Sequence, residues 1–201
     1  MDDYGGPLHL VTDHNIAKLL LDHGADVNDL SDLGETPFHV AARNGRLDVA
    51  KLLLDHGAHI NAHGYEIIDT FDVRATPLRY ALEALGNHFL MAKLLLDRGA
   101  DHNLADSEEG TALHVAARLG CEKSTKLLLD HGAPLDVQDD TGWTALHIAS
   151  YLGHSAVAKV LVNCGAYLNI LDRQGNSPTD LAVRNGYFQT MMLVLARYEA
   201  N

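Results

Sequence analysis

The sequence has few cysteines, few basic residues and no long hydrophobic run. Its two cysteines, Cys121 and Cys164, form no CxxC pair, so we expect reduced, buried thiols rather than a disulfide framework. Lysine and arginine total 15 against 27 acidic residues, a formal net charge of −12. This balance argues against nucleic acid and anionic membranes as partners, because both are bound through cationic surfaces. The longest uncharged stretch, residues 141–158, contains Gly, Ser, Thr and His, so we expect no membrane insertion.

The first residues of the chain also contain no targeting signal. They are acidic and carry no apolar segment, so neither a signal peptide nor a transit peptide is expected. Together with reduced thiols, this favours a cytoplasmic or nuclear location. The composition, 47% hydrophobic and 21% charged, is ordinary for a globular protein that can bury a core.

Two short strings recur in phase along the chain. The first reads Lys-Leu-Leu-Leu-Asp-His-Gly-Ala and returns, with substitutions, from Lys18, Lys51, Lys93, Lys126 and Lys159. The second reads Thr-Pro-Leu-His or a variant of it, and begins at Thr36, Thr76, Thr111, Thr144 and Ser177, with a weaker copy at Gly6. The glycines of the first string lie 33 residues apart, except that 42 residues separate Gly57 from Gly99. A fixed period of this length indicates a repeat architecture.

Each copy has the local chemistry of two short helices. Thr36 followed by Pro37 is a helix N-cap with proline at the first helical position, and glycines such as Gly45 and Gly57 end the helices. The second helix carries an apolar stripe, which we expect to be buried at Leu52, Leu53, Leu94, Leu95, Leu127 and Leu128. One apolar face of such a helix pair stays open, so the pairs must stack on one another.

These strings resemble the ankyrin repeat, whose period is 33 residues and whose signature is T-P-L-H-x-A. The resemblance covers nearly the whole chain. It implies an all-α ankyrin-repeat solenoid of helix-turn-helix repeats with projecting β-hairpin or loop fingers, twelve helices and no central sheet. We expect one domain over residues 1–201 with repeats at about 1–30, 31–63, 64–105, 106–138, 139–171 and 172–201.

The departures from the repeat are informative. The finger over about residues 62–75 is long: Asn61 to Thr76 spans 15 residues, against 8 elsewhere. Two further residues lengthen the same repeat near residues 86–88. The first repeat is three residues short, which suits either a terminal cap or an inner repeat of a longer chain. Thr179 and Asp180 put polar residues in the last repeat, as in a capping repeat.

The resemblance implies a function in protein–protein interaction. Members of the family bind partners on a concave surface of fingers and first helices, so we expect a monomeric scaffold or adaptor for a protein partner. Two alternatives are a recognition module of a longer protein and an inhibitor that caps an enzyme active site. Aligning the repeats with one another places the candidate contact residues on the first helices and fingers: Arg43, Asn44, Tyr65, Ile67, Ile68, Phe71, Arg118, Trp143, Tyr151 and Arg184. The same alignment places Glu35 among the residues at the finger tips.

Each of these candidates also has a structural interpretation. Arginine and aromatic residues are common at interface hot spots. The arginines can instead pair with acidic fingers, Trp143 can cover a neighbouring finger, and the apolar residues of the long finger can pack back on the protein. The hairpin asparagines Asn28, Asn61, Asn103 and Asn169 are structural in the family and are sometimes hydroxylated.

No catalytic, metal or cofactor site is predicted. In the family, His9, His39, His114 and His147 would form local and bridging hydrogen bonds, and His23, His56 and His131 precede helix-ending glycines, where a cation is favourable. His59 and His63 lack a third ligand at zinc spacing. P-loop, G-x-G-x-x-G and G-x-S-x-G motifs are absent from the sequence. We therefore expect a non-enzymatic protein without a cofactor.

Overall fold

The computed structural model describes residues 5–68, 71–84, 89–105 and 110–198, with the side chains of 65–68, 71–74, 195, 197 and 198 excepted. The chain forms two compact parts, residues 1–101 and 102–201, which we call the N-terminal half and the C-terminal half. Each half is described by itself.

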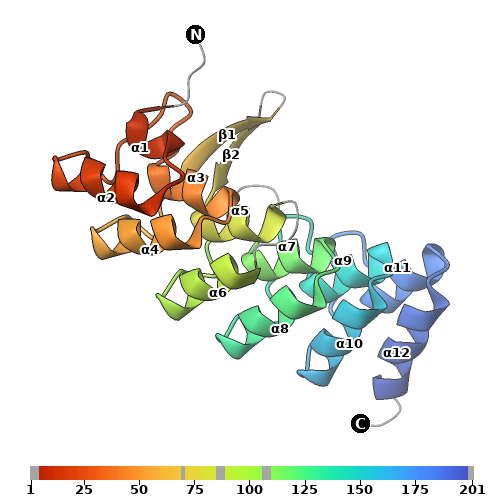
Figure 1. The fold of residues 1–201 in the computed structure, drawn as a ribbon. Coiled ribbons are helices and arrows are strands. Elements are labelled where there is room, and N and C mark those ends of the chain that lie inside the picture. Colours follow the sequence, from red (N-terminus) through yellow and green to blue (C-terminus); the bar gives the residue numbers. More distant parts are fainter. Residues whose placement is uncertain (1–4, 69–70, 85–88, 106–109, 199–201) are drawn as a thin grey trace. The chain divides into compact units, whose positions relative to one another are not determined.

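The N-terminal half contains six helices and one β-hairpin (Figure 1). The helices are α1 (Pro7–Leu10), α2 (His14–Asp22), α3 (Pro37–Arg43), α4 (Leu47–Asp55), α5 (Pro77–Glu83) and α6 (Phe89–Asp97). The first helices α1, α3 and α5 pack side by side, and α4 packs between α2 and α6. Among the described residues, each helix pair therefore packs against the pairs next to it in sequence, as in a repeat protein.

Over its described residues, the C-terminal half repeats the same arrangement of helices without a long hairpin. Its helices are α7 (Ala112–Arg118), α8 (Glu122–Asp130), α9 (Ala145–Leu152), α10 (Ser155–Asn163), α11 (Pro178–Arg184) and α12 (Phe188–Tyr198). Helix α9 packs between α7 and α11, and α10 packs between α8 and α12. Over the described residues the chain thus has the twelve helices expected from the repeats and no central sheet.

The long finger forms the hairpin. Strands β1 (Gly64–Ile68) and β2 (Phe71–Ala75) pair antiparallel, with Gly64 opposite Ala75 and Ile68 opposite Phe71. The hairpin projects away from the helices of its half (Figure 1). At its base, a Cβ atom on Gly64 would lie 3.2 Å from Nε2 of His39, so a larger residue there would press on the histidine ring. The extension around residues 86–88 lies outside the described residues.

The helix ends form as the sequence predicts. Pro37 is the first residue of α3, and the Thr36 hydroxyl accepts a hydrogen bond from the His39 amide. Gly45 and Gly57 follow helices with φ of 64° and 88°, the left-handed conformation that glycine tolerates best. Helix α1 has four residues where α3 has seven, and Gly6 supplies no capping side chain. The shortening of the first repeat is therefore a shortening of its first helix.

The leucine stripe is buried with one exception. Leu52, Leu53, Leu95, Leu127 and Leu128 are buried as predicted. Leu94 is only half-buried, and Leu96 is buried in its place, because α6 presents Met91, Leu95 and Leu96 to the core. The expectation of buried thiols was wrong: Cys121 is half-buried, and Cys164 is exposed. Both cysteines lie at helix ends, Cys121 before α8 and Cys164 after α10, and not on a buried stripe.

Candidate partner-binding surface

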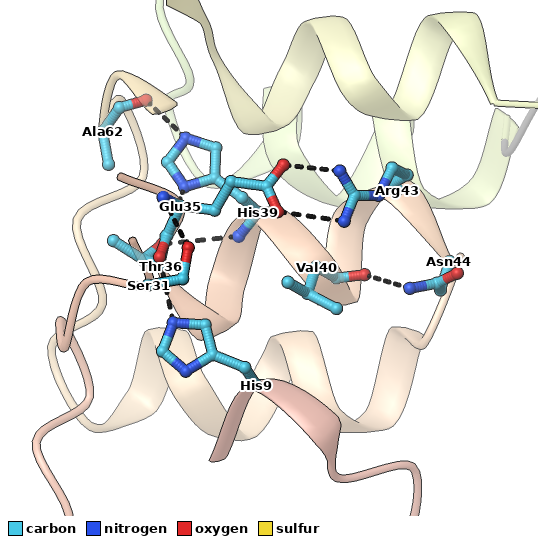
Figure 2. Close-up of polar contacts among 9 residues, drawn as sticks. All are labelled: His9, Ser31, Glu35, Thr36, His39, Val40, Arg43, Asn44 and Ala62. Atoms are coloured by element: carbon cyan, nitrogen blue, oxygen red, sulfur yellow. Dashed lines mark hydrogen bonds and ion pairs between the residues drawn. The ribbon is translucent and has the colours of Figure 1, made fainter. Parts of the chain in front are cut away.

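The histidines of the Thr-Pro-Leu-His string join successive repeats (Figure 2). The Thr36 amide donates to Nδ1 of His39 at 3.0 Å, and Nε2 lies 3.0 Å from the carbonyl oxygen of Ala62 in the next finger. An amide N–H can only donate, so Nδ1 is the unprotonated nitrogen and Nε2–H donates to Ala62. The family-based expectation of a local and bridging hydrogen bond is confirmed.

The same arrangement recurs in the C-terminal half. Nε2 of His114 lies 3.0 Å from the Val137 carbonyl oxygen, and Nε2 of His147 lies 3.3 Å from that of Asn176. Burial lowers the pKa of His39 to about 4, and it also lowers the pKa values of His114 and His147. These imidazoles are therefore neutral at pH 7 and serve as fixed links between repeats.

The other repeated polar residues are structural as well. His23, His56 and His131 each place Nδ1 2.8 Å from the carbonyl oxygen four residues earlier. The same oxygen also accepts the backbone N–H of that histidine, so the ring adds a second hydrogen bond at the end of the helix. The Asn28 side chain donates to Gly57 O and accepts from the His59 amide. Asn61 accepts from the Asp101 amide. Hydroxylation of these asparagines stays a prediction.

The arginine and asparagine at the end of α3 make local contacts. Both terminal nitrogens of the Arg43 guanidinium reach the Glu35 carboxylate, with Nη2 2.9 Å from Oε2 (Figure 2). The guanidinium carbon lies 5.2 Å from the Tyr80 ring centroid. Glu35 is buried, so its placement at an exposed finger tip was wrong: the ion pair draws its carboxylate inward. The interpretation that Arg43 pairs with an acidic finger is confirmed. Asn44 is exposed and donates to Val40 O at 2.8 Å.

The C-terminal half contains a pocket of about 410 Å³ between its fingers and first helices. It is lined by His114, Arg118, Asp139, Thr141, Trp143, Ile148, Tyr151, Leu152 and Gln174. Trp143 and Tyr151 form an aromatic pair in its wall, with ring centroids 4.9 Å apart and planes inclined by 50°. The walls are therefore mostly apolar, and the polar groups of Thr141 and Gln174 are exposed beside them.

Two carboxylates, those of Asp139 and Asp172, hold Trp143 in place. Oδ1 of Asp139 accepts the amides of Thr141 and Trp143 at 2.8 and 2.9 Å, which fixes the finger turn. The Trp143 indole N–H donates to Oδ2 of Asp172 at 3.0 Å, in the next finger. Burial disfavours the charged Asp172, but hydrogen bonds from Asn176, Gln174 and Trp143 outweigh it and lower its pKa to about 2.

Three of the predicted contact residues share this pocket: Arg118, Trp143 and Tyr151. Arg184 is exposed at the end of α11 and does not line the pocket. For Tyr65, Ile67, Ile68 and Phe71 the strand register is described, but their side chains lie outside the described part of the structure. Asp139 and Asp172 were not predicted from the sequence, although both stand five residues before a helix N-cap, at Thr144 and Ser177.

The described residues contain neither a metal site nor a membrane-spanning helix. No group of three His, Cys, Asp or Glu side chains there could hold a metal ion. Within the same ranges, no helix combines the length and apolar character needed to cross a membrane.

The stacked helix pairs, the histidine links and the fingers define a repeat protein built of helix-turn-helix units. The family model described as ankyrin repeats (3 copies) matches residues 2–64, 78–172 and 113–201. The chain therefore belongs to the ankyrin repeat family.

One solved relative agrees with this assignment over almost its full length. An ankyrin repeat domain from Acinetobacter baumannii AYE superposes with a TM-score of 0.84 at 26% sequence identity, covering 96% of this chain and 97% of that one. No curated protein matches the chain.

Proposed function

We propose that this protein is a scaffold or adaptor that binds a protein partner through its fingers and first-helix ends. Ankyrin repeats in general mediate protein–protein interactions, which supports the class of function. The observation that carries the proposal is the pocket of the C-terminal half, because an accessible aromatic pair lies there between the fingers and the first helices. We also propose that the protein acts without catalysis, by non-covalent binding in the cytoplasm or nucleus.

The pocket has the properties of an anchor site for a partner side chain. Tyr151 is 41% exposed although its ring contacts Trp143, so it presents apolar area that the fold does not cover. A cavity of about 410 Å³ falls in the usual range of ligand pockets, and it is large enough for a bulky apolar side chain. Trp143 is held through Asp172, so little side-chain entropy would be lost on binding. Arg118 at the pocket edge adds a residue type that is frequent at hot spots.

Replacing Tyr151 by alanine is expected to weaken partner binding by about 1–4 kcal/mol, the scale of an aromatic hot spot. The side chain is exposed, so the thermal unfolding midpoint should stay near that of the wild type. The partner is first captured from a lysate of the source cells on immobilised wild-type protein, and titration calorimetry then gives Kd for both forms.

Tyr167→Ala is the matched control for this experiment. Tyr167 is an exposed tyrosine of the same half and does not line the pocket, so its removal should leave Kd unchanged. Equal Kd values for wild type, Tyr151→Ala and Tyr167→Ala would show that the partner binds elsewhere.

We propose the long finger as a second contact region, on the basis of its length and of the large apolar residues in its sequence, Tyr65, Ile67, Ile68 and Phe71. Replacing residues 62–75 by a finger of the standard eight-residue span should keep the unfolding midpoint and weaken partner binding. Extra loop length by itself costs little closure entropy, so the midpoint reports packing and not length. A lower midpoint with unchanged Kd would mean that the finger packs on its own protein.

A further inference from the structure

Two positions of the repeat lie close together on the proposed binding surface. The first is the residue just before the N-cap of the first helix, and the second is eight residues later, at the end of that helix. In the second repeat these positions hold Glu35 and Arg43, which form an ion pair. In the fifth repeat they hold Trp143 and Tyr151, whose rings are in contact. The residues at these two positions therefore determine the local charge of the surface.

In the sixth repeat the ion pair is not kept. Arg184 stands at the position of Arg43, but Asn176 takes the place of Glu35. The Asn176 amide nitrogen is turned to the carboxylate of Asp172, 3.1 and 3.0 Å from its two oxygens. The sixth repeat thus retains the arginine and has no carboxylate at the position that neutralises it in the second repeat.

The acidic residue on the same helix as Arg184 is already bound. Asp180 lies one turn earlier on α11, and its Oδ2 accepts the amide and the hydroxyl of Ser177 at 2.8 and 2.6 Å. Arg173, at the tip of the same finger, is also exposed, and its amide bonds to the carbonyl oxygen of Thr141 beside the pocket. Within the described ranges, neither Arg173 nor Arg184 forms an ion pair.

Basic residues on the second helices differ from these two arginines. Lys18, Lys93 and Lys126 each pair with an acidic residue one turn away on the same helix. The exposed arginines of the sixth repeat therefore offer positive charge on the side of the protein where the pocket opens.

Tyr151 lies between two arginines in the row of first helices. Helix α9 packs between α7 and α11, and Arg118, Tyr151 and Arg184 occupy the same repeat position on these three helices. Packed helices lie about 8–10 Å apart, and an extended chain advances about 3.3 Å per residue. A partner residue that binds beside Tyr151 would therefore have an arginine within reach of the residues about three positions before and after it.

We propose that the partner presents an acidic protein segment to this surface. A bulky apolar side chain of the segment enters the pocket beside Tyr151, and Asp or Glu residues about three positions away on either side pair with Arg118 and Arg184. This inference rests on the proposed function, because it names the charge of the segment that the same pocket binds. The net charge of −12 does not oppose it at close range, since salt screens charges beyond about 8 Å at physiological ionic strength.

Titration with three seven-residue peptides tests the proposal. Each peptide has a central Phe and two Ser or Gly residues on either side of it, and both outer residues are Glu, Gln or Lys; the termini are acetylated and amidated. Trp143 is the single tryptophan of the chain and lines the pocket, so its fluorescence reports occupancy. Each exposed ion pair contributes up to about fivefold in affinity, so the acidic peptide should bind about tenfold more tightly than the neutral one. The basic peptide should bind most weakly, because like charges repel.

Arg184→Gln should weaken binding of the acidic peptide by up to about fivefold and leave the neutral peptide unchanged. Lys159→Gln is the matched control, because Lys159 is an exposed cation of the same half but lies on the second helix α10. This control should leave all three affinities unchanged. Tyr151→Ala should weaken all three peptides alike, since it alters the pocket and not the charge beside it. Unfolding midpoints near the wild-type value would show that the variants fold.

Several results would overturn the acidic segment. They are equal affinities for the three peptides, tighter binding of the basic peptide, no response to the acidic peptide, and an equal effect of Arg184→Gln on the acidic and neutral peptides. A single-stranded oligonucleotide that displaces the acidic peptide as well from Tyr151→Ala as from the wild type would show a general anion site instead. The proposed function has a separate readout: affinities that do not change in Tyr151→Ala would exclude the pocket as the anchor, whatever the charge preference.

Discussion

Lowering the pH from 7 to 4 is expected to remove about 3 kcal/mol of stability through His39 alone. The pKa of this imidazole is about 4 in the folded protein, against an ordinary 6.5. The unfolded chain therefore binds more protons than the folded one between these pH values. Titration of His39 leaves the free energy of unfolding unchanged above pH 6.5 and lowers it as the pH drops towards 4. Below that pH it causes no further change.

The hydrogen bonds explain why protonation is unfavourable. Protonated His39 would carry a hydrogen on Nδ1, facing the amide of Thr36 that now donates to it. The pKa values of His114 and His147 are lowered in the same direction, so they add to the loss. Asp172 affects stability in a separate pH range. Its pKa is lowered to about 2, so the stability that its charged form adds to the folded protein is lost only below about pH 4.

Urea denaturation at a series of pH values measures this effect. His39→Asn removes the titrating group, so it should lower stability at pH 7 and flatten the decline between pH 6.5 and 4. His59→Asn alters an exposed histidine and should reproduce the wild-type curve. A wild-type free energy of unfolding that is constant from pH 6.5 to 4.5 would contradict the buried, neutral state of His39.

The second large effect is expected in the core of the C-terminal half. Leu128→Ala should cost about 2–5 kcal/mol, the usual range for truncating a fully buried leucine. Leu128 lies on α8, which packs against both α7 and α10, so the cavity would loosen two helix contacts. Equilibrium denaturation in urea gives the change in the free energy of unfolding.

Leu119→Ala is the matched control for that core substitution. Leu119 follows α7 and is exposed, so its truncation should change stability by no more than about 0.5 kcal/mol. If Leu128→Ala denatured at the wild-type midpoint, the buried stripe of α8 would be wrongly assigned.

The periodic features of the sequence predicted the fold because they act locally. Thr36, Pro37 and Gly45 set the start and end of α3 through hydrogen bonds and backbone conformation within a few residues. The leucine stripe failed only at Leu94, in the repeat whose preceding segment is longer than the others. Local rules determine where helices lie, but which residues of a helix are buried also depends on the elements that pack against it.

The site was harder to predict because it depends on contacts between repeats. Registry placed Arg118, Trp143 and Tyr151 on the same side of the protein, and they do line one pocket. It could not show that Glu35 turns inward to Arg43, since that depends on the distance between a finger and the end of a helix. Nor could it show that Asp172 holds the Trp143 indole, since 29 residues separate them.

The histidine links have a consequence for how such a chain can change during evolution. His39, His114 and His147 bond to main-chain carbonyl oxygens, of Ala62, Val137 and Asn176, and not to particular side chains. A repeat that is duplicated, deleted or exchanged as a whole would therefore still offer its neighbour a main-chain acceptor from its finger. The chain shows this tolerance itself: the 15-residue finger keeps the Ala62 carbonyl in place for His39. Recombination in whole repeats can thus lengthen or rearrange the proposed binding surface while the histidine links between repeats are kept.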